Sequence, residues 1–177
     1  DEGRSYFSDA KKGTKIGATL FGADVTIYSD PTHPVVPSTP WGGDGLPLGR
    51  TVWVDHGVLK DLSVGRFWAE KKGLAPLSSG SNIIMEGGTG GVDDLVAATE
   101  YGLLLTSFWY IRTVDPRPIL HAGLTRDGLF LIEKGKIVRP VVNFRWNESP
   151  AALFKTIELL GKPERAEAEW QKVVDQA

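Results

Sequence analysis

A glycine-rich segment lies between an expected short strand and an expected helix, the setting in which phosphate-binding loops occur. The strand is expected at 83–85, the loop at 86–91 reads EGGTGG, and apolar residues at helical spacing begin at Val92. The loop lacks the Gly-Lys-Ser/Thr ending of a P-loop, and no acidic ribose partner follows at about 20 residues. Two alternatives stay open: a turn whose glycines permit positive φ, or amides that receive a peptide carboxylate or backbone.

The chain has three histidines, which could bind a metal through nitrogen, and no cysteine, which would bind one through sulfur. His33, His56 and His121 are far apart in the sequence, whereas zinc ligands usually include pairs at short spacing. We therefore predict no metal site and no catalytic residues in this chain. A hydrolase site formed by these histidines and carboxylates converging in space remains an alternative.

An aromatic pair beside an arginine is the other candidate binding feature. Trp109, Tyr110 and Arg112 could form a stacking surface for a ligand, although aromatic residues in a strand more often pack in a core. No Gly-x-Ser-x-Gly motif indicates a serine nucleophile. The residues that we predict to contact a substrate are Gly87, Gly88, Thr89, Gly90, Tyr110, Arg112 and Arg126.

Composition and charge exclude several classes of protein. The 177 residues are 41% hydrophobic and include 20 basic and 22 acidic residues without a dense run of either sign. Such a balance gives no electrostatic footprint for nucleic acid or an anionic membrane. No apolar stretch approaches the roughly 20 residues that span a bilayer. The lack of cysteine fits a reducing compartment and also a secreted protein without disulfides; we expect a cytoplasmic protein. The single methionine is Met85, which suggests a processed product, a domain or an incomplete reading frame.

The elements that must position these residues indicate an α+β fold, predominantly antiparallel β-sheet, with a meander at 103–146 and two or three helices. A hairpin is expected at 50–59 with its turn at 55–57. The nearly continuous apolar run at 103–112 predicts a strand buried on both faces. The Asp115-Pro116-Arg117 sequence predicts a turn after this strand, and Arg126-Asp127-Gly128 predicts a further hairpin turn.

Two helices and one undecided segment complete the prediction, because residues 61–72 could form either a short helix or more hairpin. The first begins at Val92 and ends before Gly102, a residue suited to the position after a helix. The second begins after Ser149 as N-cap with Pro150 in its first turn, and Leu153, Ile157 and Leu160 form its apolar stripe. We divide the chain into a domain at 1–163 and a charged helical tail at 164–177.

The amino-acid sequence of residues 102–149 resembles that of the C-terminal domain of the TldD/PmbA family. The resemblance lies in FWYIR at 108–112, VDPR at 114–117, GLTRDGLFLIE at 123–133, GKIV at 135–138 and PVVNFRWNES at 140–149, and extends over about residues 4–163. This family, long labelled modulators of DNA gyrase, comprises predicted zinc proteases that act in peptide maturation and degradation. Its catalytic members resemble one another in a His-Glu-x-x-x-His helix and a later cysteine, neither of which this chain contains.

The resemblance implies a non-catalytic or incomplete domain of a zinc metalloprotease system that processes or degrades peptides. The chain would act as a scaffold or as a peptide-binding or dimerisation unit, inactive alone and without a cofactor of its own, and zinc would belong to the catalytic members. The expected partners are a second copy or a TldD-like subunit, with a peptide as substrate and neither nucleic acid nor membrane. A free-standing module that binds a small ligand or peptide is the alternative.

Overall fold

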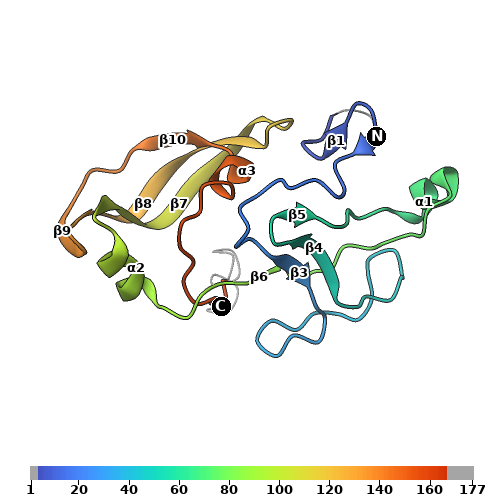
Figure 1. Ribbon diagram of the computed structural model, residues 1–177, viewed down its shortest axis with the longest axis horizontal. Coiled ribbons are helices and arrows are strands. Elements are labelled where there is room, and N and C mark those ends of the chain that lie inside the picture. The colour runs from blue at the N-terminus through green and yellow to red at the C-terminus, as the bar shows by residue number, and fades with distance from the viewer. Residues whose placement is uncertain (1–3, 167–177) are drawn as a thin grey trace, which may run out of the picture.

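In the part of the chain that the structure describes, all neighbouring strands within a sheet pair in the antiparallel direction. The computed structural model describes residues 4–166 and contains a small hairpin and two larger sheets (Figure 1). In chain order the elements are β1 Ser8–Asp9, β2 Gly13–Thr14, β3 Ile27–Ser29, β4 Thr51–Asp55, β5 Val58–Leu59, α1 Arg66–Lys72, β6 Ile84–Met85, α2 Val92–Ala98, β7 Tyr101–Asp115, β8 Leu120–Glu133, β9 Lys136–Pro140, β10 Arg145–Glu148 and α3 Pro150–Leu153. The α+β prediction, mostly antiparallel sheet with a few short helices, is confirmed.

The first large sheet has the strand order β5-β4-β3-β6 and carries the main core. Its β4–β5 hairpin confirms the predicted turn, where His56 and Gly57 both have positive φ. Alternation along β4 directs Val54 inward, 4% exposed, next to Leu59 at 2%. The buried cluster consists of Leu20, Phe21, Val25, Val54, Leu59 and Ala151. Because Ala151 lies in α3, the core of this sheet includes the C-terminal helix.

The second large sheet is centred on β8, which pairs with β7 along one edge and with β9 and β10 along the other. The predicted meander at 103–146 is therefore confirmed for β7, β8 and β9, whereas β10 returns to β8 instead of pairing with β9. The long hairpin, the two shorter strands and α2 occupy the same side of the molecule (Figure 1). Within residues 4–166 no helix is long and apolar enough to cross a membrane.

The predicted turn at residues 126–128 is wrong, because β8 continues through it. Asp127 does have a positive φ of 64°, but the register shift between Leu105 and Ser107 shows that the extra residue forms a β-bulge. A left-handed Asp before Gly serves a bulge as well as a turn. The reversal between β7 and β8 is at 116–119, at the predicted Asp115-Pro116-Arg117 turn, where the Arg117 amide donates to the Asp115 carboxylate at 2.9 Å.

The prediction that both faces of the 103–112 strand are buried is also wrong. Phe108, Tyr110 and Ile111 are 54%, 60% and 53% exposed. All residues of β7 from Phe108 to Asp115 are exposed, so this end of the long hairpin has no cover within the described residues, although its sequence has the apolar continuity of an interior strand.

The two helices after residue 90 begin where predicted but end earlier. Ala98 is the last residue of α2, Thr99 follows in extended conformation, and Gly102 is already in β7. Ser149 is the N-cap of α3, but its hydroxyl donates to the Pro118 carbonyl at 2.6 Å instead of capping the helix. α3 ends at Leu153, and residues 158–166 are neither helix nor strand. The predicted helical tail lies mostly outside the described residues, which end at 166.

Candidate functional site

The glycine-rich loop holds a segment of the chain's own backbone. The Gly88 amide donates to the Gly161 carbonyl at 3.0 Å, and the Lys162 amide donates to the Gly90 carbonyl at 2.7 Å. A Cβ atom on Gly87 or Gly88 would overlap the carbonyl oxygen of Gly161 or Leu160. These glycines thus permit close approach of residues 160–163, which we call the C-terminal segment. Thr89 is exposed beside them.

The start of α2 explains why the loop turns where it does. The Gly91 amide donates to the Asp94 carboxylate at 2.7 Å, which satisfies one of the unpaired amides at the helix N-terminus. Asp93 and Asp94 lie in the first turn as predicted, where carboxylates oppose the positive end of the helix dipole. The carboxylates make this N-terminus a poor place for a phosphate.

The second group of predicted residues lies on the exposed surface of the β7–β8 hairpin. The Arg112 guanidinium lies 4.7 Å from the centre of the Tyr110 ring, and that of Arg126 lies 4.1 Å from the centre of the Trp109 ring. Tyr110 has a φ of 53°, and the register shifts between Trp109 and Arg112. We call Trp109, Tyr110, Arg112 and Arg126 the aromatic–arginine surface. It offers π faces and guanidinium donors to a ligand.

The predicted site residues therefore form two groups and not one. Tyr110 lies nine residues beyond Tyr101, roughly 30 Å along the strand by its rise per residue. The glycine loop precedes α2 at the other end of β7. A single small ligand cannot contact both groups.

The Arg112 side chain tunes the acidity of the Tyr110 phenol. A hydrogen bond from Arg112, followed by its positive charge, holds the pKa of Tyr110 below the ordinary value of 10.0. We predict that Arg112→Ala raises the pKa of Tyr110, because the phenolate loses a donor and a nearby cation. A pH titration of the Tyr110 ring signals by NMR measures the change. Arg139→Ala, on the exposed strand β9, serves as the control and should leave it unchanged.

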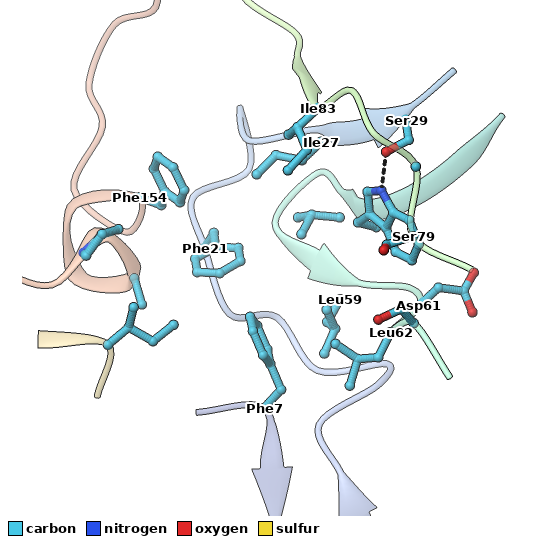
Figure 2. Close-up of a pocket in the computed structure, with 17 residues that line it drawn as sticks. Phe7, Phe21, Ile27, Ser29, Leu59, Asp61, Leu62, Ser79, Ile83 and Phe154 are labelled. Atoms are coloured by element: carbon cyan, nitrogen blue, oxygen red, sulfur yellow. Dashed lines mark hydrogen bonds between the residues drawn. The ribbon is translucent and has the colours of Figure 1, made fainter. Parts of the chain in front are cut away.

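A cavity of about 330 Å³ is the feature that sequence reasoning missed. Figure 2 shows its apolar walls, which include Phe21, Ile27, Leu59 and Phe154. The walls come from segments as distant as residue 7 and residue 154, and most are ordinary core residues by type. No local pattern could reveal the cavity.

Comparison with protein families assigns the chain. The model described as the PmbA/TldA metallopeptidase C-terminal domain matches residues 1–172. The chain belongs to this family. No curated protein gives a match.

The same fold is present in solved structures of two proposed modulators of DNA gyrase and of TldE. A proposed modulator of DNA gyrase from Bacteroides thetaiotaomicron has a TM-score of 0.78 at 23% identity, covering 94% of this chain and 37% of that one. TldE from Thermococcus kodakarensis has a TM-score of 0.76 at 19% identity, covering 94% and 41%. A proposed modulator of a DNA gyrase from Thermotoga maritima has a TM-score of 0.76 at 20% identity, covering 89% and 38%. The chain thus spans about two fifths of the length of these proteins.

Metallopeptidases require a metal, and the described residues of this PmbA/TldA domain do not fit one. Within residues 4–166 no three His, Cys, Asp or Glu side chains are grouped to hold an ion. His33 Nδ1 lies 3.3 Å from the Val36 amide, His56 Nδ1 lies 3.2 Å from the Ala23 carbonyl, and His121 faces Thr113. The three histidines are separate, so no catalytic step can be derived from them.

Proposed function

We propose that this chain is the part of a TldD/PmbA-type peptidase system that binds extended peptide along the free edge of β7. The observation that carries the proposal is the pairing of this strand. β7 is 15 residues long and pairs with β8 along one edge, while its other edge has no strand partner within residues 4–166. An edge strand presents unpaired amide and carbonyl groups, which an extended peptide can pair with by strand addition.

The side chains around this edge suit a peptide of mixed sequence. Phe108, Tyr110, Ile111 and Val114 are at least half exposed and offer apolar contacts to alternate side chains of an added strand. Arg112 and Arg126 add donors for carboxylates. Backbone pairing supplies affinity that depends little on sequence, a property that suits a protein handling many peptides.

The remaining predicted residues have a different part in the proposal. Gly87, Gly88, Thr89 and Gly90 receive an extended backbone, and the C-terminal segment already occupies that place. We propose that the loop anchors residues 160–163 and so keeps α3 against the first sheet. In this scheme residues 1–163 act as the domain and 164–177 as a charged tail.

The partner of this domain is proposed to be a TldD-like subunit or a second copy, in the cytoplasm. The support is the uncovered apolar face of the hairpin and the length of the matched structures, of which this chain covers 37–41%. Metal chemistry would be supplied by the partner. The near-neutral charge, net -2, gives no support for direct binding to DNA.

A binding experiment tests the edge. An Ile111→Lys/Val114→Lys variant should bind a labelled ten-residue peptide at least tenfold more weakly, because lysines on an edge oppose strand addition. Fluorescence polarisation measures the affinity, and hydrogen exchange should show slower exchange of β7 amides when peptide is bound. Val142→Lys is the control, because Val142 is 89% exposed and lies outside the strands.

Two outcomes would contradict the proposal. One is unchanged exchange of the β7 amides at millimolar peptide. The other is a dimeric mass by light scattering that the double lysine variant converts to monomer, without any peptide binding by either form. That second result would assign the edge to self-association.

A further inference from the structure

The cavity lies where the two halves of the fold meet. Its walls combine the first sheet, through Ile27 and Leu59, with Phe154 after α3 and Ile119 from the β7–β8 reversal. Figure 2 shows Phe21 and Phe154 on one side and Ser29, Ser79 and Asp61 on the other. The volume of about 330 Å³ lies in the range of small-molecule sites.

Ser29 is the buried serine among the lining residues, and its hydroxyl already has hydrogen-bond partners. The buried Ser29 hydroxyl donates to the Asn82 carbonyl at 2.7 Å and accepts from the Trp53 indole at 2.8 Å, the bond drawn in Figure 2. This hydroxyl therefore already donates one hydrogen bond and accepts another. A ligand inside the cavity therefore obtains its binding free energy mainly from burying apolar surface, and little from hydrogen bonds.

Ile119 is held in the cavity wall by a strained backbone. Its φ of 56° is rare for a β-branched residue, and it packs against the core cluster. The turn could reach the same reversal with glycine or asparagine at this place. An isoleucine here indicates that an apolar side chain in the wall matters more than a relaxed turn.

The rim carries the only charge. Among the seventeen lining residues, Asp61 is the single ionisable one, accompanied by Ser63 and Ser79, and all three are exposed. Figure 2 shows the Asp61 carboxylate turned outward from the wall. A carboxylate at the rim attracts a cation and repels an anion at the same position. A neutral hydroxyl or amide head could bond with the serines.

We propose that this cavity binds a small molecule with an apolar body of about ten non-hydrogen atoms and a cationic or neutral polar head. Arylalkylamines are the matching chemical class, with the ring among Phe21, Ile27 and Leu59 and the amine at the edge of the cavity beside Asp61. The ligand bridges the first sheet and the α3 region, so it stabilises their packing. The proposal is independent of peptide binding at β7.

The test uses the whole chain and two probes of similar size, 2-phenylethylamine and phenylacetate. The amine should bind with a Kd on the order of 0.1–1 mM, shifting the methyl NMR signals of Ile27, Leu59 and Ile119. Phenylacetate should bind roughly fivefold more weakly, and Asp61→Asn should remove that difference. Asp24→Asn, at a residue that does not line the cavity, should preserve it.

A blocking variant separates the cavity from other apolar surfaces. Ile83 lines the mouth and is 76% exposed, so Ile83→Trp should fill the entrance without disturbing the core and weaken amine binding at least tenfold. Val142→Trp adds the same indole outside the cavity and should bind normally. The proposal is overturned if the methyl signals do not move at 5 mM amine, if Ile83→Trp binds like wild type, or if phenylacetate binds equally well.

Discussion

A Gly57→Ala variant is expected to lose about 3–5 kcal/mol of unfolding free energy, a large fraction of the stability of a typical domain. Gly57 has a φ of 78°, and an added Cβ would overlap the Phe21 carbonyl oxygen and lie 2.7 Å from that of Gly22. The Gly57 carbonyl also accepts from the amides of Leu20 and Phe21, at 2.8 and 3.1 Å. Moving this turn therefore disrupts the core cluster. Urea unfolding followed by circular dichroism measures the loss.

Gly17→Ala separates backbone strain from overlap. Gly17 has a similar φ of 85°, but nothing lies within 4 Å of an added Cβ. This control should lose only about 1–2 kcal/mol, the cost of a left-handed non-glycine residue. Equal losses for the two variants would mean that the close approach at Gly57 contributes nothing.

Local patterns were sufficient for the β4–β5 hairpin, whose turn and strands are neighbours in the sequence. The β4–β5 hairpin follows from its β-branched strand and its Asp-His-Gly turn. The same reasoning failed at Asp127, because a positive φ before glycine fits both a turn and a bulge. The pairing of β7 with β8 over their whole length determines that Asp127 lies in a bulge. This pairing involves residues far apart in the sequence, so no local sequence pattern reveals it.

The end of α3 shows how tertiary contacts override helix periodicity. Leu153, Ile157 and Leu160 have helical spacing, yet Gly22 donates to the Phe154 carbonyl at 2.9 Å, and the C-terminal segment continues to the glycine loop. The contacts of the first sheet and the loop exceed what another two turns of helix would gain.

The candidate site was predictable in its residue types but not in its grouping. Tyr110 and Arg112 are close in sequence and do meet, whereas Arg126 meets Trp109 only through the pairing of two strands. The cavity depends on residues from both ends of the chain, so its shape is a property of packing alone. Sequence reasoning about apolar residues can place them inside but cannot locate the gap between them.

Gly88→Ala is expected to release the C-terminal segment from the glycine loop while leaving the sheets folded. Gly88 does not have a positive φ, so alanine fits the backbone, but its Cβ would overlap the Leu160 carbonyl oxygen. Separation breaks the hydrogen bonds from Gly88 to Gly161 and from Lys162 to Gly90. At about 1 kcal/mol each, with lost packing, exchange of the Lys162 amide should accelerate roughly 30- to 100-fold. Hydrogen exchange followed by NMR measures it.

Gly91→Ala is the matched control in the same loop, because nothing lies within 4 Å of a Cβ added there. It should leave exchange at Lys162 near the wild-type rate, since the change affects only the first turn of α2. Equal acceleration in both variants would mean that any substitution in the loop loosens the segment and that the close approach at Gly88 is not what holds it. If only Gly88→Ala accelerates exchange, the glycines serve as a seat for extended backbone, and a peptide added in excess should compete with residues 160–163 for that seat in the wild-type chain.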